Sequence, residues 1–205
     1  MPSPLWLTDL HLNFVRPEVW SDLIQEIVAR QPSALLVGGD TAEANSWESY
    51  LTRLAEAAGC PVQFVLGHPD YYRSSIAAVR AAARSLCRRS PLLNWLPDSD
   101  SIPIGPDAVL IGHGGWGDAR TPEYRTSDVV LNDYLLIEEL RAASGADLLG
   151  SPSGPVSANS LLTPELQETL QSLGDEAGAH FRRVLPIAAA QASHIVVLMH
   201  VPPFR

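Results

Sequence analysis

The chain has 205 residues, a length at which a single domain with a full hydrophobic core is expected. Its formal net charge of −9 and isoelectric point near 5.0 exclude broad electrostatic binding to nucleic acid or to an anionic membrane surface. The two cysteines, Cys60 and Cys87, follow no disulfide spacing, and no apolar stretch resembles a membrane span or a signal peptide. We therefore expect a cytoplasmic protein.

Short apolar runs alternate with helical segments through the first ninety residues. Strands are predicted over residues 5–7, 34–37 and 62–66, and helices over 17–30, 46–58 and 74–89. The strands are apolar throughout and each is followed by a helix, which predicts βαβ units and a parallel sheet. The fold class is therefore expected to be α/β.

The second half of the chain departs from this alternation. Two short apolar runs, 102–104 and 109–111, flank a Gly-Pro-Asp turn and predict a hairpin. Three longer elements are predicted after it: helices over 129–143 and 164–192 and an apolar core strand over 195–199. We expect one domain over 1–205, with a helical insertion over 119–193.

Four of the apolar runs end in side chains that can bind metal ions. In chain order these are Asp9, His11, Asp40, His68, Asp70 and His200. Because ligands in open α/β sheets bind beyond the carboxyl ends of the strands, the four segments are expected to converge at one edge. Carboxylate and imidazole without thiolate favour Mn, Fe, Zn or Co, and imidazole disfavours a Mg or Ca site. The sequence therefore predicts a metal centre.

These segments resemble four motifs of the calcineurin-like metallophosphoesterases, in the family's order. The family's DxH, GD and GNH[DE] motifs and its strand-end His match Asp9-Leu10-His11, Gly39-Asp40, Gly67-His68-Pro69-Asp70 and His200. The resemblance covers nearly the whole chain. It implies an α/β/β/α sandwich and metal-dependent hydrolysis of phosphoesters.

The resemblance also implies two divalent transition-metal ions, with Mn, Fe or Zn as the expected elements. Asp9, His11 and Asp40 would bind the first ion, and Asp40 would bridge to a second ion that His68 and His200 also bind. Ions roughly 3.5–4 Å apart would clamp the phosphate of a phosphorylated substrate and activate the attacking water. His68 and Asp70 are the expected catalytic residues of the third motif.

The third motif departs from the family pattern at two positions. His68 stands where the family has a metal-binding Asn, and Pro69 stands where it has the His that assists the leaving group. Proline has no proton to donate. Asp70, which orients that His in the family, is expected to act as a structural acceptor. The family's fifth motif, GHxH, does not occur in the 205 residues, so a C-terminally truncated fold with an impaired site is expected.

Two functions are open at this point. Metal-dependent hydrolysis is favoured by the intact Asp9, His11 and Asp40. A degenerate fold that serves as a non-catalytic binding or scaffolding module is favoured by Pro69 and the missing fifth motif. In either case a core strand over 195–199 beside an unfilled sheet position predicts self-association through the exposed edge.

Three histidines lie outside the motifs. His113 belongs to a GxGxxG sequence over 112–117, but the residues after it cannot open a helix, so dinucleotide binding is rejected. His113 is expected either near the substrate or as a satisfied loop residue. His180 and His194 are expected at the surface.

Overall fold

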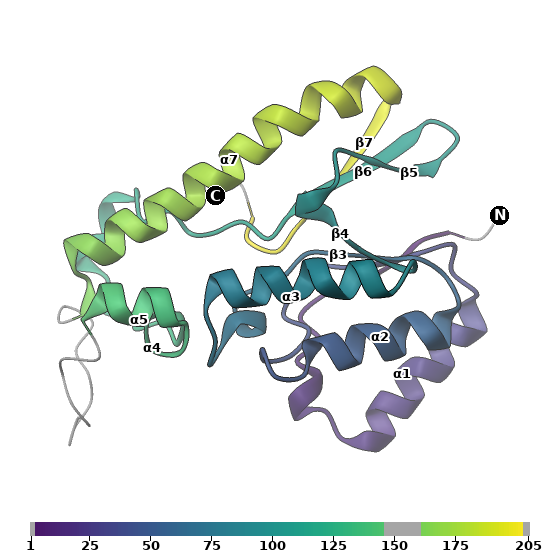
Figure 1. Ribbon diagram of the computed structural model, residues 1–205, viewed down its shortest axis with the longest axis horizontal. Coiled ribbons are helices and arrows are strands. Elements are labelled where there is room, and N and C mark those ends of the chain that lie inside the picture. Colours follow the sequence, from purple (N-terminus) through teal and green to yellow (C-terminus); the bar gives the residue numbers. More distant parts are fainter. Residues whose placement is uncertain (1–2, 146–160, 203–205) are drawn as a thin grey trace.

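The computed structural model describes residues 3–145 and 161–202. They form two facing β-sheets with helices on both outer sides (Figure 1). The first sheet has four parallel strands in chain order: β1 (Leu5–Leu7), β2 (Leu35–Val37), β3 (Val62–Phe64) and β4 (Leu93–Trp95). Its outer helices are α1 (Pro17–Arg30), α2 (Trp47–Ala58) and α3 (Ile76–Arg89). The α/β fold with a parallel sheet is confirmed.

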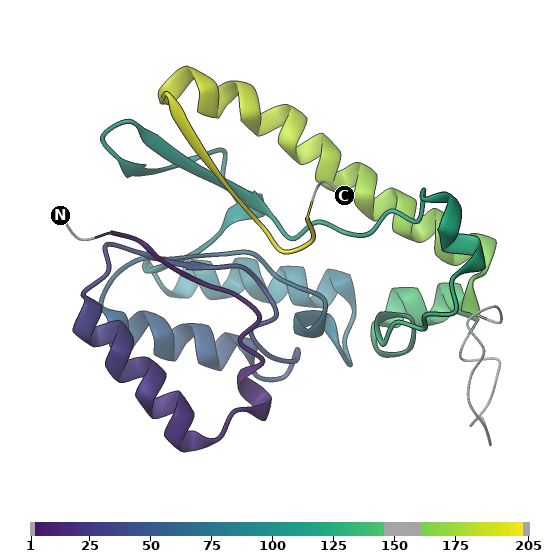
Figure 2. The same ribbon diagram turned by 180° about the vertical axis from the view of Figure 1, so that it is seen from behind.

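The second sheet has three strands and one long covering helix. Its strands are β5 (Ile102–Gly105), β6 (Ala108–His113) and β7 (His194–Met199). The β5–β6 hairpin is antiparallel, as predicted, whereas β7 pairs with β6 in parallel. Figure 2 shows α7 (Pro164–Gln191) running along this sheet. The shorter helices α4 (Asp133–Leu136) and α5 (Glu138–Ser144) lie before α7 in the chain.

Alternation along the strands divides the core into layers. In β6, Leu110 belongs to an apolar cluster between the sheets, while its neighbours Val109 and Ile111 pack with Val184 of α7. Successive strand residues point to opposite faces, so one strand serves both layers. Burying each such aliphatic side chain stabilises the fold by about 1.5–3 kcal/mol. The packed layers hold the carboxyl ends of β1, β2, β3 and β7 in place.

Two local predictions differ from the structure. Strand β4 was not predicted, and the helix predicted over 129–143 is broken at Ile137, where the backbone is extended. The break follows from backbone bonds to the loop after β3: Arg73 N–H donates to the Leu136 carbonyl at 2.7 Å, and Glu138 N–H donates to the Ser74 carbonyl at 3.1 Å. Tertiary pairing therefore outweighs helix propensity here.

No helix in the described ranges combines the length and the apolarity that a membrane span needs.

The β7 strand leaves one edge unpaired within the described residues. Val196 aligns with Leu110 and Val197 with Ile111, yet Val196 is 38% exposed and Val197 45% exposed. Their partners on β6, Leu110 and Ile111, are buried. Each valine therefore lies on a face of the sheet that is covered at the neighbouring strand. An unpaired apolar edge is a template for another strand.

We expect the chain to self-associate by pairing of two β7 edges, and this stays a prediction. Val197→Lys should shift the molecule toward monomer in concentration-dependent light scattering, because a charge would have to be buried in the paired edge. Val19→Lys, a substitution of a similarly exposed valine on α1, is the matched control. A wild-type chain that stays monomeric at high concentration would contradict the prediction.

Candidate metal centre

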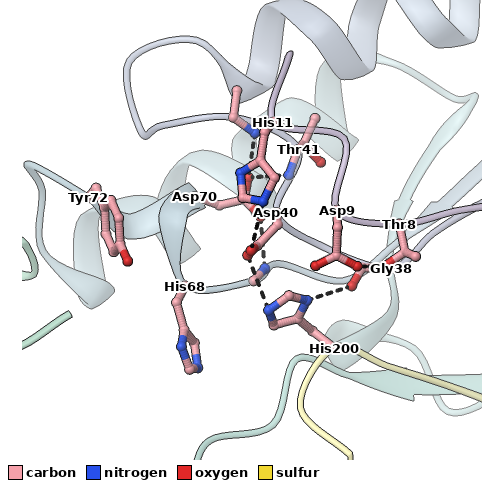
Figure 3. Close-up of polar contacts among 12 residues, drawn as sticks. Thr8, Asp9, His11, Gly38, Asp40, Thr41, His68, Asp70, Tyr72 and His200 are labelled. Carbon is pink, nitrogen blue, oxygen red and sulfur yellow. Dashed lines mark hydrogen bonds and ion pairs between the residues drawn. The ribbon is translucent and has the colours of Figure 1, made fainter. Parts of the chain in front are cut away.

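Three predicted ligands form one compact group. Oxygen and nitrogen atoms of Asp9, Asp40 and His200 all lie within 4.8 Å of one another, and Nε2 of His200 is 3.1 Å from Oδ1 of Asp40 (Figure 3). Nδ1 of His200 is 3.1 Å from the carbonyl oxygen of Gly38, to which it can only donate. With this proton on Nδ1, a neutral ring would present its Nε2 lone pair to the Asp40 carboxylate, an arrangement that a bound cation stabilises.

The loops after β1 and β2 are held in unusual backbone conformations. Asp9, His11 and Asp40 have φ angles of +52°, +43° and +52°, in the left-handed region that few non-glycine residues adopt. The two loops are joined by backbone hydrogen bonds from Asp9 N–H to the Gly39 carbonyl and from His11 N–H to the Asp40 carbonyl. Such strained positions persist only where the surroundings hold them, and they cluster at functional sites.

Two glycines allow these loops to meet the loop after β3. A Cβ atom on Gly67 would lie 2.1 Å from Oδ1 of Asp40, and one on Gly39 would lie 2.6 Å from the backbone nitrogen of Gly67. Gly39 also has a φ of +93°. A side chain on Gly67 would displace the Asp40 carboxylate, and one on Gly39 would displace the backbone of Gly67, so both positions require glycine sterically.

The buried Asp40 carboxylate lies at the centre of the group. Burial raises its pKa, and nearby Asp9 adds to the rise, whereas His200, His11 and His68 oppose it. Nε2 of His11 lies 3.6 Å from Oδ2 of Asp40, while Oδ1 receives no hydrogen bond within the described structure. A divalent cation would supply the missing positive partner. The donor set and its electrostatics therefore fit such an ion.

Asp70 connects the loops instead of facing the cluster. Its Oδ1 accepts hydrogen bonds from the backbone N–H groups of Thr41 and Ala42 at 3.0 and 3.1 Å, and its Oδ2 accepts one from Gly67 at 2.8 Å. Complete burial raises the pKa of Asp70 to about 7, although these three donors oppose the rise. Both oxygens serve the backbone, so Asp70 positions the Asp40 and His68 loops, and a catalytic role for it stays a prediction.

His68 lies outside the three-residue group. Its Nδ1 is 2.8 Å from Oδ2 of Asp133, and the hydroxyl of Tyr72 donates to Oδ1 of the same carboxylate at 2.7 Å. The His68 ring stacks on Trp116, with centroids 4.7 Å apart and an angle of 16° between the planes. Its centroid is 5.6 Å from that of His200. Metal binding by His68 stays a prediction.

Asp133 is the site residue that sequence reasoning missed. Burial alone would raise its pKa, but the bonds from His68 and Tyr72 outweigh burial and hold the pKa below its ordinary value. No signal in the sequence points to it, because it lies 65 residues from His68 within a segment predicted as continuous helix. The break at Ile137 is what leaves α4 as a separate turn beside the site.

The chain matches a known protein family. The family described as calcineurin-like phosphoesterase matches residues 5–204, nearly the whole chain. The chain belongs to the calcineurin-like phosphoesterase family. The resemblance seen in the four motifs is thereby confirmed. Neither a curated protein nor a solved structure matches the chain.

Calcineurin-like phosphoesterases generally hydrolyse phosphoesters and bind divalent metals, and the cluster of Asp9, Asp40 and His200 is a possible metal site of this kind. His11 borders this cluster through Asp40. His68 of the third motif lies outside the cluster, and its side chain is bonded to Asp133.

The remaining histidines of this calcineurin-like phosphoesterase are placed differently. His113 ends β6, is buried, and accepts a hydrogen bond from Gly115 N–H at Nδ1; burial, His180 and Arg80 lower its pKa to about 4. The expectation that His180 lies at the surface is wrong: it is 9% exposed, and its ring centroid is 5.3 Å from that of His113. It occupies the face of α7 that packs on β6. His194 is exposed, as expected.

Proposed function

We propose that this calcineurin-like phosphoesterase hydrolyses phosphoesters with divalent transition metals, manganese among them, bound by Asp9, His11, Asp40 and His200. The observation that carries the proposal is the cluster of Asp9, Asp40 and His200, with a buried carboxylate oxygen that lacks a donor and an imidazole lone pair facing it. Divalent cations supply positive charge for the phosphoryl transition state and lower the pKa of water.

The protein's own side chains would position the reacting groups. The bond to the Gly38 carbonyl orients the His200 ring, and Asp70 fixes the loops that carry Asp40 and His68. This arrangement is set before substrate binds, which is the property that makes electrostatic stabilisation effective. We expect Asp70 to act through these loops.

A second ion is part of the proposal, with Asp40 as the bridge and His68 as a further ligand. Nδ1 of His68 is bonded to Asp133, so His68 would bind through Nε2, which is buried and has no hydrogen-bond partner in the described part of the chain. A carboxylate that fixes the other nitrogen of a ligating imidazole is the usual partner of a metal-binding histidine.

The free cysteines Cys60 and Cys87 support the further proposal of a cytoplasmic location.

The second candidate function is a binding or scaffolding module without catalysis. The observation that favours it is Pro69, which opens the 3-10 helix Pro69–Tyr71 at the position of the family's proton donor. Retained metal without turnover would support this alternative.

The deciding experiment compares hydrolysis of 4-nitrophenyl phosphate and bis(4-nitrophenyl) phosphate with and without manganese. We expect weak turnover that a chelator abolishes and manganese restores. His200→Ala should lower the turnover by at least about tenfold, because a ligand should matter no less than the outer-shell partners of a metal. His194→Ala, a change of an exposed histidine at the start of β7, is the control. Metal-replete wild-type protein that hydrolyses neither ester would favour the scaffolding function.

A further inference from the structure

A cavity of about 640 Å³ adjoins the metal cluster. His68, Met199 and Val201 line its end nearest the cluster, and Met199 and Val201 are the chain neighbours of His200. The His68 ring, which is 5.6 Å from the His200 ring between centroids, also lines the cavity. The residues of the cluster do not themselves line the cavity, and His68 is the residue that brings the two close together. A molecule whose phosphate lies at the cluster could extend past His68 into the cavity.

The lining of the cavity is mainly aromatic and aliphatic. Its larger apolar side chains include Trp116, Tyr124, Tyr134, Leu170 and Phe181. Helix α7 contributes Gly174 and Gly178 between Leu170 and Phe181. A Cβ atom on Gly178 would contact only the guanidinium of Arg182, so the missing side chain leaves the hollow open there, whereas Gly174 packs against Asp118. The volume falls within the roughly 300–1,000 Å³ of small-molecule sites, which are mostly apolar with a few polar groups.

The charged groups of the lining disfavour a polyanion. Among the residues whose side chains the structure describes, Arg120 is the only arginine of the lining, and its guanidinium is already paired with Asp118 at 2.9 Å and with Asp175 at 2.8 Å. Asp118 and Asp133 add two carboxylates to the same lining. Nucleic acid and polyphosphorylated ligands depend on unpaired cations along their path. This cavity instead suits an uncharged group.

His68 is the polar residue of the lining that lies nearest the cluster, and its Nε2 is the atom proposed above as a ligand of the second ion. From these observations we infer that the cavity binds the organic part of the substrate, and that the substrates are phosphoesters that carry a bulky, uncharged, mainly apolar group. The inference rests on the proposed function and adds the substrate class. The phosphate lies at the cluster, and the apolar group lies against Trp116 and α7.

The test compares 2-naphthyl phosphate with phenyl phosphate, whose leaving groups are similar but whose size differs by one ring. With manganese, kcat/KM for the naphthyl ester should exceed that for the phenyl ester by about tenfold or more, since each further buried carbon adds to binding. Gly178→Leu should remove this preference. A Cβ atom on Gly178 meets only the tip of Arg182, and Leu is a better helix former than Gly, so the variant should fold.

Ala179→Leu is the matched control, because Ala179 is the next residue on α7 and is exposed outside the cavity. Gly178→Ala provides a smaller step at the same position. Binding of 2-naphthol to the metal-free protein, measured by calorimetry, gives a readout that does not need turnover. We expect binding to wild type and to Ala179→Leu, and at least tenfold weaker binding to Gly178→Leu.

The outcomes separate the two proposals. Naphthol binding that Gly178→Leu removes, with no hydrolysis of any ester, would overturn the proposed function and support the cavity. Equal turnover of both esters, unaffected by Gly178→Leu, would overturn the cavity and leave the hydrolase intact. Competition by a short oligonucleotide as strong as that by 2-naphthol would also contradict the assignment of the cavity to an apolar organic group.

Discussion

Replacing Asp40 by alanine is expected to remove most of the transition metal that the purified chain binds. Asp40 is 8% exposed, lies 3.1 Å from Nε2 of His200 and 3.6 Å from Nε2 of His11, and shares one group with Asp9. Without its charge the remaining ligands are mainly imidazoles, and any two cations held there would face each other unshielded. Outer-shell partners of a metal are worth about 10–100-fold in affinity, so this ligand should cost at least as much.

The measurement is the metal content of wild type and Asp40→Ala by elemental analysis, followed by a manganese titration. Asp22→Ala, which removes an exposed carboxylate on α1, controls for the loss of one negative charge. We expect wild-type metal content in this control. Equal metal content in Asp40→Ala and wild type would refute the assignment of the cluster.

The elements that carry the metal-binding motifs were predictable because each rests on a local pattern. Strands over 5–7 and 62–66 and the strand before His200 are short apolar runs, and the rule that ligands gather beyond strand ends brings Asp9, Asp40 and His200 together. Helix α1 begins at Pro17, as its sequence indicates. The fold class and the grouping of Asp9, Asp40 and His200 were therefore predictable from local patterns, whereas metal binding by the group stays a prediction.

The missed features depend on contacts between distant segments. The three residues of β4, Leu93–Trp95, show no pattern of their own and become a strand only by pairing with β3. The break at Ile137 depends on bonds to Arg73 and Ser74, more than sixty residues earlier. The pair of His68 with Asp133 follows from that break. Local periodicity cannot predict contacts between segments so far apart. From the sequence, the third motif therefore shows only the unusual residues His68 and Pro69, and not the contact of His68 with Asp133.

The residues His68 and Pro69 are expected to determine which leaving groups the chain can release. In its neutral form the His68 ring has one N–H, and with Nδ1 2.8 Å from Oδ2 of Asp133 that N–H would be donated to Asp133 and Nε2 would be left as an acceptor. Pro69 has no donor at all. A departing alkoxide would receive no proton from either residue, whereas a nitrophenolate leaves without one. General acid assistance contributes about 10²–10⁴-fold, so its absence should fall mainly on esters with poor leaving groups.

We therefore expect the wild-type chain to hydrolyse a nitrophenyl phosphoester weakly and an alkyl phosphoester almost not at all. Pro69→His should raise turnover of the alkyl ester by about tenfold or more and of the nitrophenyl ester by less. The double variant His68→Asn, Pro69→His should gain most, because it restores the family's residues at both positions. All four combinations are to be assayed with manganese saturating. Pro97→His makes the same change in the 3-10 helix Leu96–Asp98 and should alter neither rate. If the double variant gains nothing on the alkyl ester although its metal content matches wild type, Pro69 does not occupy the place of the missing acid.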